Sequence, residues 1–126
     1  MPFPPDHQQM MPYLVMERAD DFILFMQRVF DAQVKMNFKS DAQIIEHAEL
    51  TIGSSVLMLS GDTKLLTPAT ASCFVYTDDA DDIYQKAINA GATVALPVKD
   101  NPNGRSGGFK DPFGNTWWVK TYRKEA

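Results

Sequence analysis

The chain has 126 residues, 44% of them hydrophobic and 22% charged, a composition that fits one globular domain. Its formal net charge of -4 and the lack of any run of Lys or Arg argue against nucleic acid as a partner, because phosphate binding needs clustered positive charge. No segment is apolar and long enough to cross a bilayer or to act as a secretory signal, and the single cysteine, Cys73, has no intrachain disulfide partner. We therefore expect a cytoplasmic protein with no membrane partner.

The first half of the chain predicts a strand and a helix after a loose segment. Residues 1–9 are rich in proline and glutamine, and we expect a flexible tail there. Tyr13 to Met16 is an apolar stretch that predicts a strand. The next apolar side chains recur at the spacing of one helix face, and they are Phe22, Phe25, Met26, Val29 and Phe30.

Further strands are predicted after this helix. From Glu46 to Ile52 apolar and polar residues alternate, so one face of the strand is apolar and the other carries His47 and Glu49. Val56 to Leu59 is a continuous apolar run, which indicates a strand covered on both faces. A short connection from Gly61 to Ala69 leads into the second half.

The second half repeats this plan at an offset of 61 residues. Ala19-Asp20-Asp21-Phe22 returns as Ala80-Asp81-Asp82-Ile83, and Gly53 returns as Gly114. Cys73 to Tyr76 predicts the first strand of the second copy. The chain is therefore interpreted as two modules with the same order of strands and helix.

Local signals mark the ends of the elements in the second copy. Asp78 or Asp79 can cap the second helix at its start, and Gly91 can end it in a left-handed conformation. Asp111-Pro112-Phe113-Gly114 is typical of a structural turn before the last strand.

Two short modules that cannot each close a core predict one shared domain over residues 1–126. We place the modules at about 10–66 and about 70–124. The expected class is α+β, with two βαβββ modules in one curved, mixed and mostly antiparallel sheet. Such an open sheet leaves edges to cover, so we expect a homodimer, possibly one that exchanges elements between subunits.

Four segments carry a resemblance to a known family: Phe25 to Ala32, His47-Ala48-Glu49-Leu50, Gly104-Arg105-Ser106-Gly107-Gly108, and Asp111 to Trp117. On these segments the chain resembles the vicinal oxygen chelate superfamily of glyoxalase I, extradiol dioxygenases and bleomycin resistance proteins. Within that group it is most similar to PhnB-like proteins, over nearly all of residues 11–122. One departure is Asp31, where relatives usually carry glycine.

The resemblance implies four positions for metal ligands inside a cupped sheet, one on the first and one on the last strand of each module. Here these positions fall at Met11, Met58, Ser72 and Trp118. A thioether, a hydroxyl and an indole offer little to a divalent ion, which prefers imidazole, carboxylate or thiolate. We therefore expect no metal at the usual site and no cofactor.

The same placement and the parity of the strands imply which side chains face the cup. We expect a ligand wall made by Tyr13, Met58, Phe74, Tyr76 and Trp118, which is aromatic and only lightly polar. The alternative is that these side chains fill the core or a subunit interface.

Three polar residues are further candidates for the site. Arg105 lies between glycines and could anchor an anionic ligand, or could pair with Asp100 or Asp111 instead. His47 and Glu49 share one strand face and could act as an acid and base pair or hold a displaced divalent metal, although a half-exposed polar face has the same pattern.

The leading functional hypothesis is a metal-free small-molecule binding protein for an aromatic or partly apolar ligand. The alternative is a lyase, isomerase or dioxygenase that uses His47 and Glu49, with or without a displaced divalent metal, and Arg105 as the substrate anchor. A third possibility is a structural or regulatory dimer whose pocket is filled by its own side chains.

Overall fold

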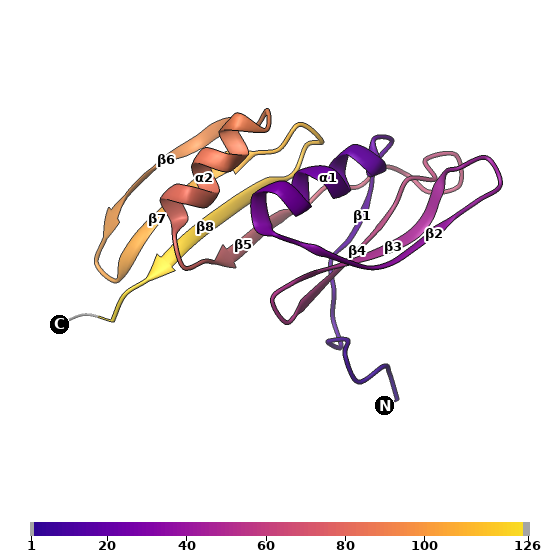
Figure 1. The fold of residues 1–126 in the computed structure, drawn as a ribbon, viewed down its shortest axis with the longest axis horizontal. Helices are drawn as coiled ribbons and strands as arrows, with labels where there is room; N and C mark the ends of the chain where they lie inside the picture. The colour runs from indigo at the N-terminus through magenta and orange to yellow at the C-terminus, as the bar shows by residue number, and fades with distance from the viewer. Residues whose placement is uncertain (1, 125–126) are drawn as a thin grey trace. The chain divides into compact units, whose positions relative to one another are not determined.

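The computed structural model describes residues 2–124, which form two compact units, one ending at Thr70 and the other beginning at Ala71. We call them the first module and the second module. Each contains one helix and four strands in the order βαβββ, so the predicted α+β class is confirmed (Figure 1).

The first module runs through β1 (Tyr13–Val15), α1 (Ala19–Phe30), β2 (Gln33–Lys39), β3 (Ile45–Ile52) and β4 (Ser55–Ser60). Its four strands form a sheet in the order β1-β4-β3-β2, with β1 parallel to β4 and the other pairs antiparallel. The second module contains β5 (Ser72–Tyr76), α2 (Ala80–Asn89), β6 (Thr93–Asn101), β7 (Gly104–Lys110) and β8 (Thr116–Tyr122). Its sheet has the corresponding order β5-β8-β7-β6.

The strands are thus divided between two four-stranded sheets, where the sequence had suggested one sheet. The reason is the pairing of the first strand of each module, which lies parallel to the last strand of the same module. Tyr13 lies opposite Met58, and Phe74 lies opposite Trp118 in the same way. Each sheet is therefore completed within its own module.

The second helix begins and ends where its sequence signals predicted. The Asp79 side chain accepts a hydrogen bond from the backbone N–H of Asp82 and so caps α2. Gly91, just after α2, has a φ of +103°, which a residue without Cβ adopts freely. Asp31 ends α1 with a φ of 54°, so the position where relatives usually carry glycine does take the left-handed conformation.

Each helix covers one face of its own sheet. The apolar face predicted for α1 is buried against the first sheet, where Ala48 and Leu50 of β3 are fully buried. In the second module α2 packs on β6, β7 and β8 (Figure 1). The ring of Tyr84 meets that of Phe109 edge-on at 6.4 Å. The opposite face of each sheet is free of the helix and carries the candidate site residues other than Arg105.

The turn before β8 is structural, as its sequence indicated. The buried Asp111 carboxylate accepts hydrogen bonds from the backbone of Phe113 and Asn115, from the Asn115 amide and from the Trp117 indole, at 2.8 to 2.9 Å. Asn115 in turn accepts from the backbone N–H of Ala71. Within residues 2–124, no helix has the length and apolar character needed to span a membrane.

Candidate functional site

Strand pairing gathers four of the predicted site residues on the face of the first sheet that lies away from α1. Met58 lies directly opposite Glu49 on one side and opposite Tyr13 on the other, so these three side chains share a face. His47 lies two residues before Glu49 on the same face, and its ring is 5.7 Å from that of Tyr13. The sequence had placed His47 and Glu49 on one strand face, and the register adds Tyr13 and Met58 to that face.

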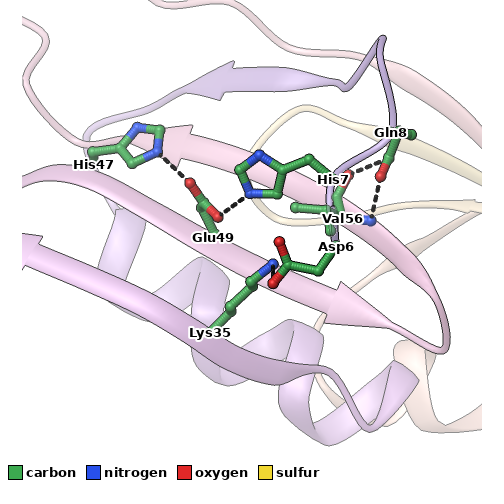
Figure 2. A network of polar contacts seen from close by, with 7 residues as sticks. All are labelled: Asp6, His7, Gln8, Lys35, His47, Glu49 and Val56. Atoms are coloured by element: carbon green, nitrogen blue, oxygen red, sulfur yellow. Dashed lines mark hydrogen bonds and ion pairs between the residues drawn. The ribbon is translucent and has the colours of Figure 1, made fainter. Parts of the chain in front are cut away.

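Glu49 is the centre of a polar cluster, which we call the His–Glu–His cluster. His47 donates from Nε2 to Glu49 Oε2 at 3.0 Å, and His7 donates from Nε2 to Glu49 Oε1 at 2.7 Å (Figure 2). The carboxylate is only 6% exposed, yet both of its oxygens have a partner. A buried carboxylate satisfied on both oxygens can stay ionised.

The pKa of Glu49 follows from two opposing effects. Burial by itself raises the pKa, because it disfavours the charged form. The hydrogen bonds from His47 and then His7 favour the carboxylate and outweigh burial, so the pKa lies below its ordinary value. Glu49 is therefore an anion at neutral pH and acts as an acceptor for both imidazoles.

The segment that brings His7 to this cluster was predicted to be a flexible tail, and this prediction is wrong for residues 6–8. Asp6 pairs with Lys35 of β2, and the Gln8 side chain makes two hydrogen bonds to the backbone of Val56, at 2.8 and 3.3 Å (Figure 2). The reason is the shortness of β1, whose pairing with β4 begins only at Met58 and leaves Val56 to the Gln8 amide. Met1, also part of the predicted tail, lies outside the described residues.

A cavity of about 500 Å3 borders this docked segment. It is lined by Pro5, Asp6, His7, Gln8, Lys35, Thr51, Gly53, Ser54 and Val56. Most of these side chains are polar, and the cavity lies next to the side of Glu49 that His7 occupies.

Sequence reasoning missed His7 as a member of the site. It is separated from Glu49 by 42 residues and lies in a segment without any periodic pattern. The available signal in the sequence was the small number of histidines, since the chain has two. Both of them contact Glu49 in the structure.

The second module has a separate cleft on the face of its sheet that lies away from α2. Its volume is about 330 Å3, and it is lined by Phe74, Leu96, Pro97, Lys99, Ser106, Gly107, Trp118 and Val119. Two of the predicted ligand residues, Phe74 and Trp118, are therefore brought together in one cleft. We call it the aromatic cleft.

Trp118 lies flat on the sheet because the neighbouring strand has no side chain at the facing position. Gly108 pairs directly with Trp118, and a Cβ at this position would lie 2.5 Å from the indole Cζ3. The indole Nε1 donates to Ser72 Oγ at 2.9 Å, which fixes the orientation of the ring. The indole face is thereby presented as one wall of the cleft.

Phe74 and Tyr76 form the outer edge of this surface on β5. Their rings meet edge-on at 5.3 Å, and Phe74 is 56% exposed. Tyr76 is also exposed but does not line the cleft itself. Large aromatic side chains that are this exposed do not belong to a packed core, so this surface differs from ordinary core packing.

Of the two roles predicted for Arg105, anchor of an anionic ligand or partner of a nearby carboxylate, its position away from the aromatic cleft agrees with the second. Arg105 alternates along β7 with Ser106, which lines the cleft, so its side chain points to the opposite face, toward α2. There its guanidinium donates to Asp81 at 2.7 and 3.2 Å and lies 3.3 Å from Asp100. These two carboxylates raise the pKa of Arg105, and the pairing with Asp100 was the predicted alternative.

Comparison with known proteins identifies the family. The model of the Glyoxalase/Bleomycin resistance protein/Dioxygenase superfamily matches residues 8–119. The chain belongs to this superfamily. The match covers both modules and agrees with the resemblance seen in the sequence.

The individual proteins that resemble this superfamily member share one third or less of its sequence. The "Uncharacterized protein Mb0911c" of Mycobacterium bovis is 32% identical, with 84% of this chain and 78% of that protein covered. Among solved structures, TioX from Micromonospora sp. ML1 is 22% identical with a TM-score of 0.73, covering 91% of this chain and 98% of that one. A PhnB protein from Bacillus cereus, described as a putative 3-demethylubiquinone-9 3-methyltransferase, is 16% identical with a TM-score of 0.71, covering 90% and 99%. At these identities the two structures support the fold alone.

The side chains at the usual metal positions of the superfamily do not fit a divalent ion. By the resemblance to the superfamily, these positions fall at Met11 and Met58 in the first module and at Ser72 and Trp118 in the second. Ser72 and Trp118 are hydrogen-bonded to each other, and an indole N–H is a donor only, so it cannot bind a cation. Within residues 2–124, no group of three or more His, Cys, Asp or Glu is arranged to hold a metal ion.

Proposed function

We propose that this superfamily member is a small-molecule binding protein that takes an aromatic or partly apolar ligand in the aromatic cleft without a metal. The observation that carries the proposal is the cleft itself, where the exposed Phe74 and the flat indole of Trp118 form two walls. Its volume of about 330 Å3 lies at the lower end of the range for small-molecule sites.

The size of the cleft sets the expected affinity. A two-ring molecule that loses about 200 Å2 of apolar surface on binding gains roughly 5 kcal/mol at about 25 cal/mol per Å2. This gain corresponds to a dissociation constant on the order of 0.1 mM. Polar contacts to the ligand would strengthen binding further and lower this dissociation constant.

The test is a titration with two-ring aromatic compounds in the presence of a chelator, followed by tryptophan fluorescence and by thermal shift. We expect binding that the chelator does not change, and loss of binding in Trp118→Leu and Phe74→Leu. Leu24→Ala is the control, because Leu24 is an exposed apolar residue of α1 outside the cleft. Binding that is equal in all three variants, or that needs an added metal, would contradict the proposal.

A second candidate function is favoured by the His–Glu–His cluster. A buried carboxylate that orients two imidazoles is an arrangement suited to general acid–base catalysis, because either ring can exchange a proton with a bound molecule. This candidate is a lyase, isomerase or dioxygenase that uses His47 and Glu49, now with His7 added. Stoichiometric metal in the purified protein that is lost in Glu49→Gln would favour this enzyme over the binding protein.

We also propose that the protein is a homodimer in the cytoplasm. The support is the apolar surface on strands at the ends of the two sheets, Val34, Met36 and Phe38 on β2 and Val94 and Leu96 on β6. Exposed apolar edge strands are usually covered by a partner. Sedimentation equilibrium tests this proposal, and a monomer at all concentrations would refute it.

A further inference from the structure

Two rows of side chains cross the second sheet on the face of the aromatic cleft. Residues that pair directly across adjacent strands share a face, so the pairing of β5, β8, β7 and β6 defines each row. The first row is Phe74, Trp118, Gly108 and Leu96. The second row, two residues further along each of β5, β8 and β7, is Tyr76, Lys120, Ser106 and Lys99.

The first row is apolar and flat, whereas the second is cationic and rich in hydroxyl groups. Lys99 and Ser106 line the cleft together with the aromatic side chains. Lys120 lies between Ser106 and Tyr76, with its ammonium group donating to the Asn103 side chain. A molecule lying on the aromatic row would therefore have two ammonium groups and two hydroxyl groups beside it.

The positive charge of the second row is not neutralised by carboxylates nearby. Within residues 2–124, no acidic residue lines the cleft and no salt bridge involves Lys99 or Lys120. Asp81 and Asp100 are held by Arg105, whose side chain points toward the α2 side of the sheet. The cleft face is thus locally cationic in a chain whose net charge is -4.

Ser106 adds a directed polar group. Its Oγ accepts a hydrogen bond from the Asn101 side chain at 2.6 Å, which leaves its own hydroxyl proton available to an acceptor in the cleft. A group held by Lys99 on one side and Lys120 on the other would lie over this hydroxyl, since Ser106 pairs with both lysines.

We propose that the ligand of the aromatic cleft is an aromatic anion. Its ring lies beside Phe74 and over the indole of Trp118, which itself fills the space above Gly108. Its carboxylate or sulfonate lies roughly 7 Å away, which is the rise of two residues along a strand, between Lys99 and Lys120. This inference rests on the proposed binding function and adds the class of ligand to it.

The experiment compares two probes of the same shape that differ in charge, 2-naphthoate and its neutral amide, by isothermal titration calorimetry. We expect naphthoate to bind about tenfold more tightly at low salt, because two partly exposed ion pairs together contribute about that factor. Raising the salt to about 0.5 M should reduce this preference, since exposed charges are screened.

Three variants connect the preference to the lysines. Lys99→Gln and Lys120→Gln should each reduce the preference to about threefold, and the double variant should abolish it, so that naphthoate and its amide bind with equal affinity. Lys86→Gln is the matched control, because Lys86 lies on α2 and pairs with Asp82. It should keep the full preference.

The outcomes distinguish failure of the anion inference from failure of the proposed binding function. Equal binding of both probes, or a preference that survives the double variant, overturns the anion inference and leaves the binding function intact. If neither probe nor any larger aromatic compound binds, the proposed function fails and the inference fails with it.

Discussion

Replacing Gly108 with alanine tests how the aromatic cleft is built. The added methyl carbon would lie 2.5 Å from Cζ3 of Trp118 and closer still to Cε3, whereas ordinary carbon contacts are about 3.5 to 4.0 Å. The indole would have to retreat by roughly 1 Å. This retreat would weaken its 2.9 Å hydrogen bond to Ser72 Oγ and change the shape of the cleft.

The magnitude follows from two opposing contributions. Overpacking of this kind costs about 1 to 3 kcal/mol. Replacing glycine also stabilises by about 0.4 to 1 kcal/mol through the unfolded state, because Gly108 has no positive φ that alanine would resist. We therefore expect a net loss of about 1 to 2 kcal/mol in the free energy of unfolding.

The assay is a double-mutant cycle measured by denaturant unfolding. In Trp118→Ala protein the obstacle is gone, so Gly108→Ala should change from destabilising to neutral or stabilising, by up to about 1 kcal/mol. The same Gly108→Ala variant, with Trp118 present, should bind aromatic probes more weakly.

The reasoning would be refuted if Gly108→Ala cost the same free energy with and without Trp118. That result would mean that the glycine serves the backbone of β7 and not the position of the indole. If Gly108→Ala left the affinity for aromatic probes unchanged, the position of the Trp118 indole would not determine ligand binding.

The remaining predictions concern the first module and the turn before β8. Asp31→Gly should raise the free energy of unfolding by about 0.5 to 1 kcal/mol in urea titrations, because Asp31 has a φ of 54°; no gain would mean that the aspartate tolerates this conformation without strain. The pKa of Glu49 lies below its ordinary value of 4.5, so its hydrogen bonds stabilise the fold fully above about pH 4.5, and this stabilisation is lost as the pH falls through the lower, folded-state pKa. Glu49→Gln should remove that part of the acid dependence of the melting temperature, and an unaltered pH profile would contradict the lowered pKa. His7→Ala should destabilise by about 1 to 3 kcal/mol in urea titrations, since one oxygen of a buried carboxylate loses its partner, and a change below about 0.3 kcal/mol would show that residues 6–8 do not dock in solution. Asp111→Ala should cost about 3 kcal/mol or more by the same measurement, because four donors lose one acceptor, and a near-neutral result would refute its role in the turn.

Much of the fold could be predicted because its signals are local. The apolar face of α1, the cap at Asp79 and the left-handed residue at Gly91 each depend on neighbours within a few residues. Strand parity also placed Trp118 on the cleft face, and the neighbouring Trp117 is buried, with its indole donating to Asp111. These expectations needed no knowledge of distant contacts.

The errors concern contacts between distant segments. His7 reaches Glu49 across 42 residues because the Gln8 amide continues the edge that the short β1 leaves open, and no local pattern shows this. The sequence left Arg105 with two possible roles, ligand anchor or partner of Asp100 or Asp111, because only strand parity in β7 decides that its guanidinium turns toward α2. Lys99 was not predicted at all, since its place beside Ser106 depends on an irregular register between β6 and β7.

The central claim is that an aromatic ligand binds at Trp118 without a metal. The chain has two tryptophans, so two indole N–H signals are expected in a proton–nitrogen NMR spectrum, one from each ring. In the presence of a chelator, 2-naphthoate should shift the Trp118 signal progressively and leave that of Trp117, which is buried and bonded to Asp111, in place. A Trp118 signal that stays fixed at millimolar ligand, or that moves only after a divalent metal is added, would contradict the account.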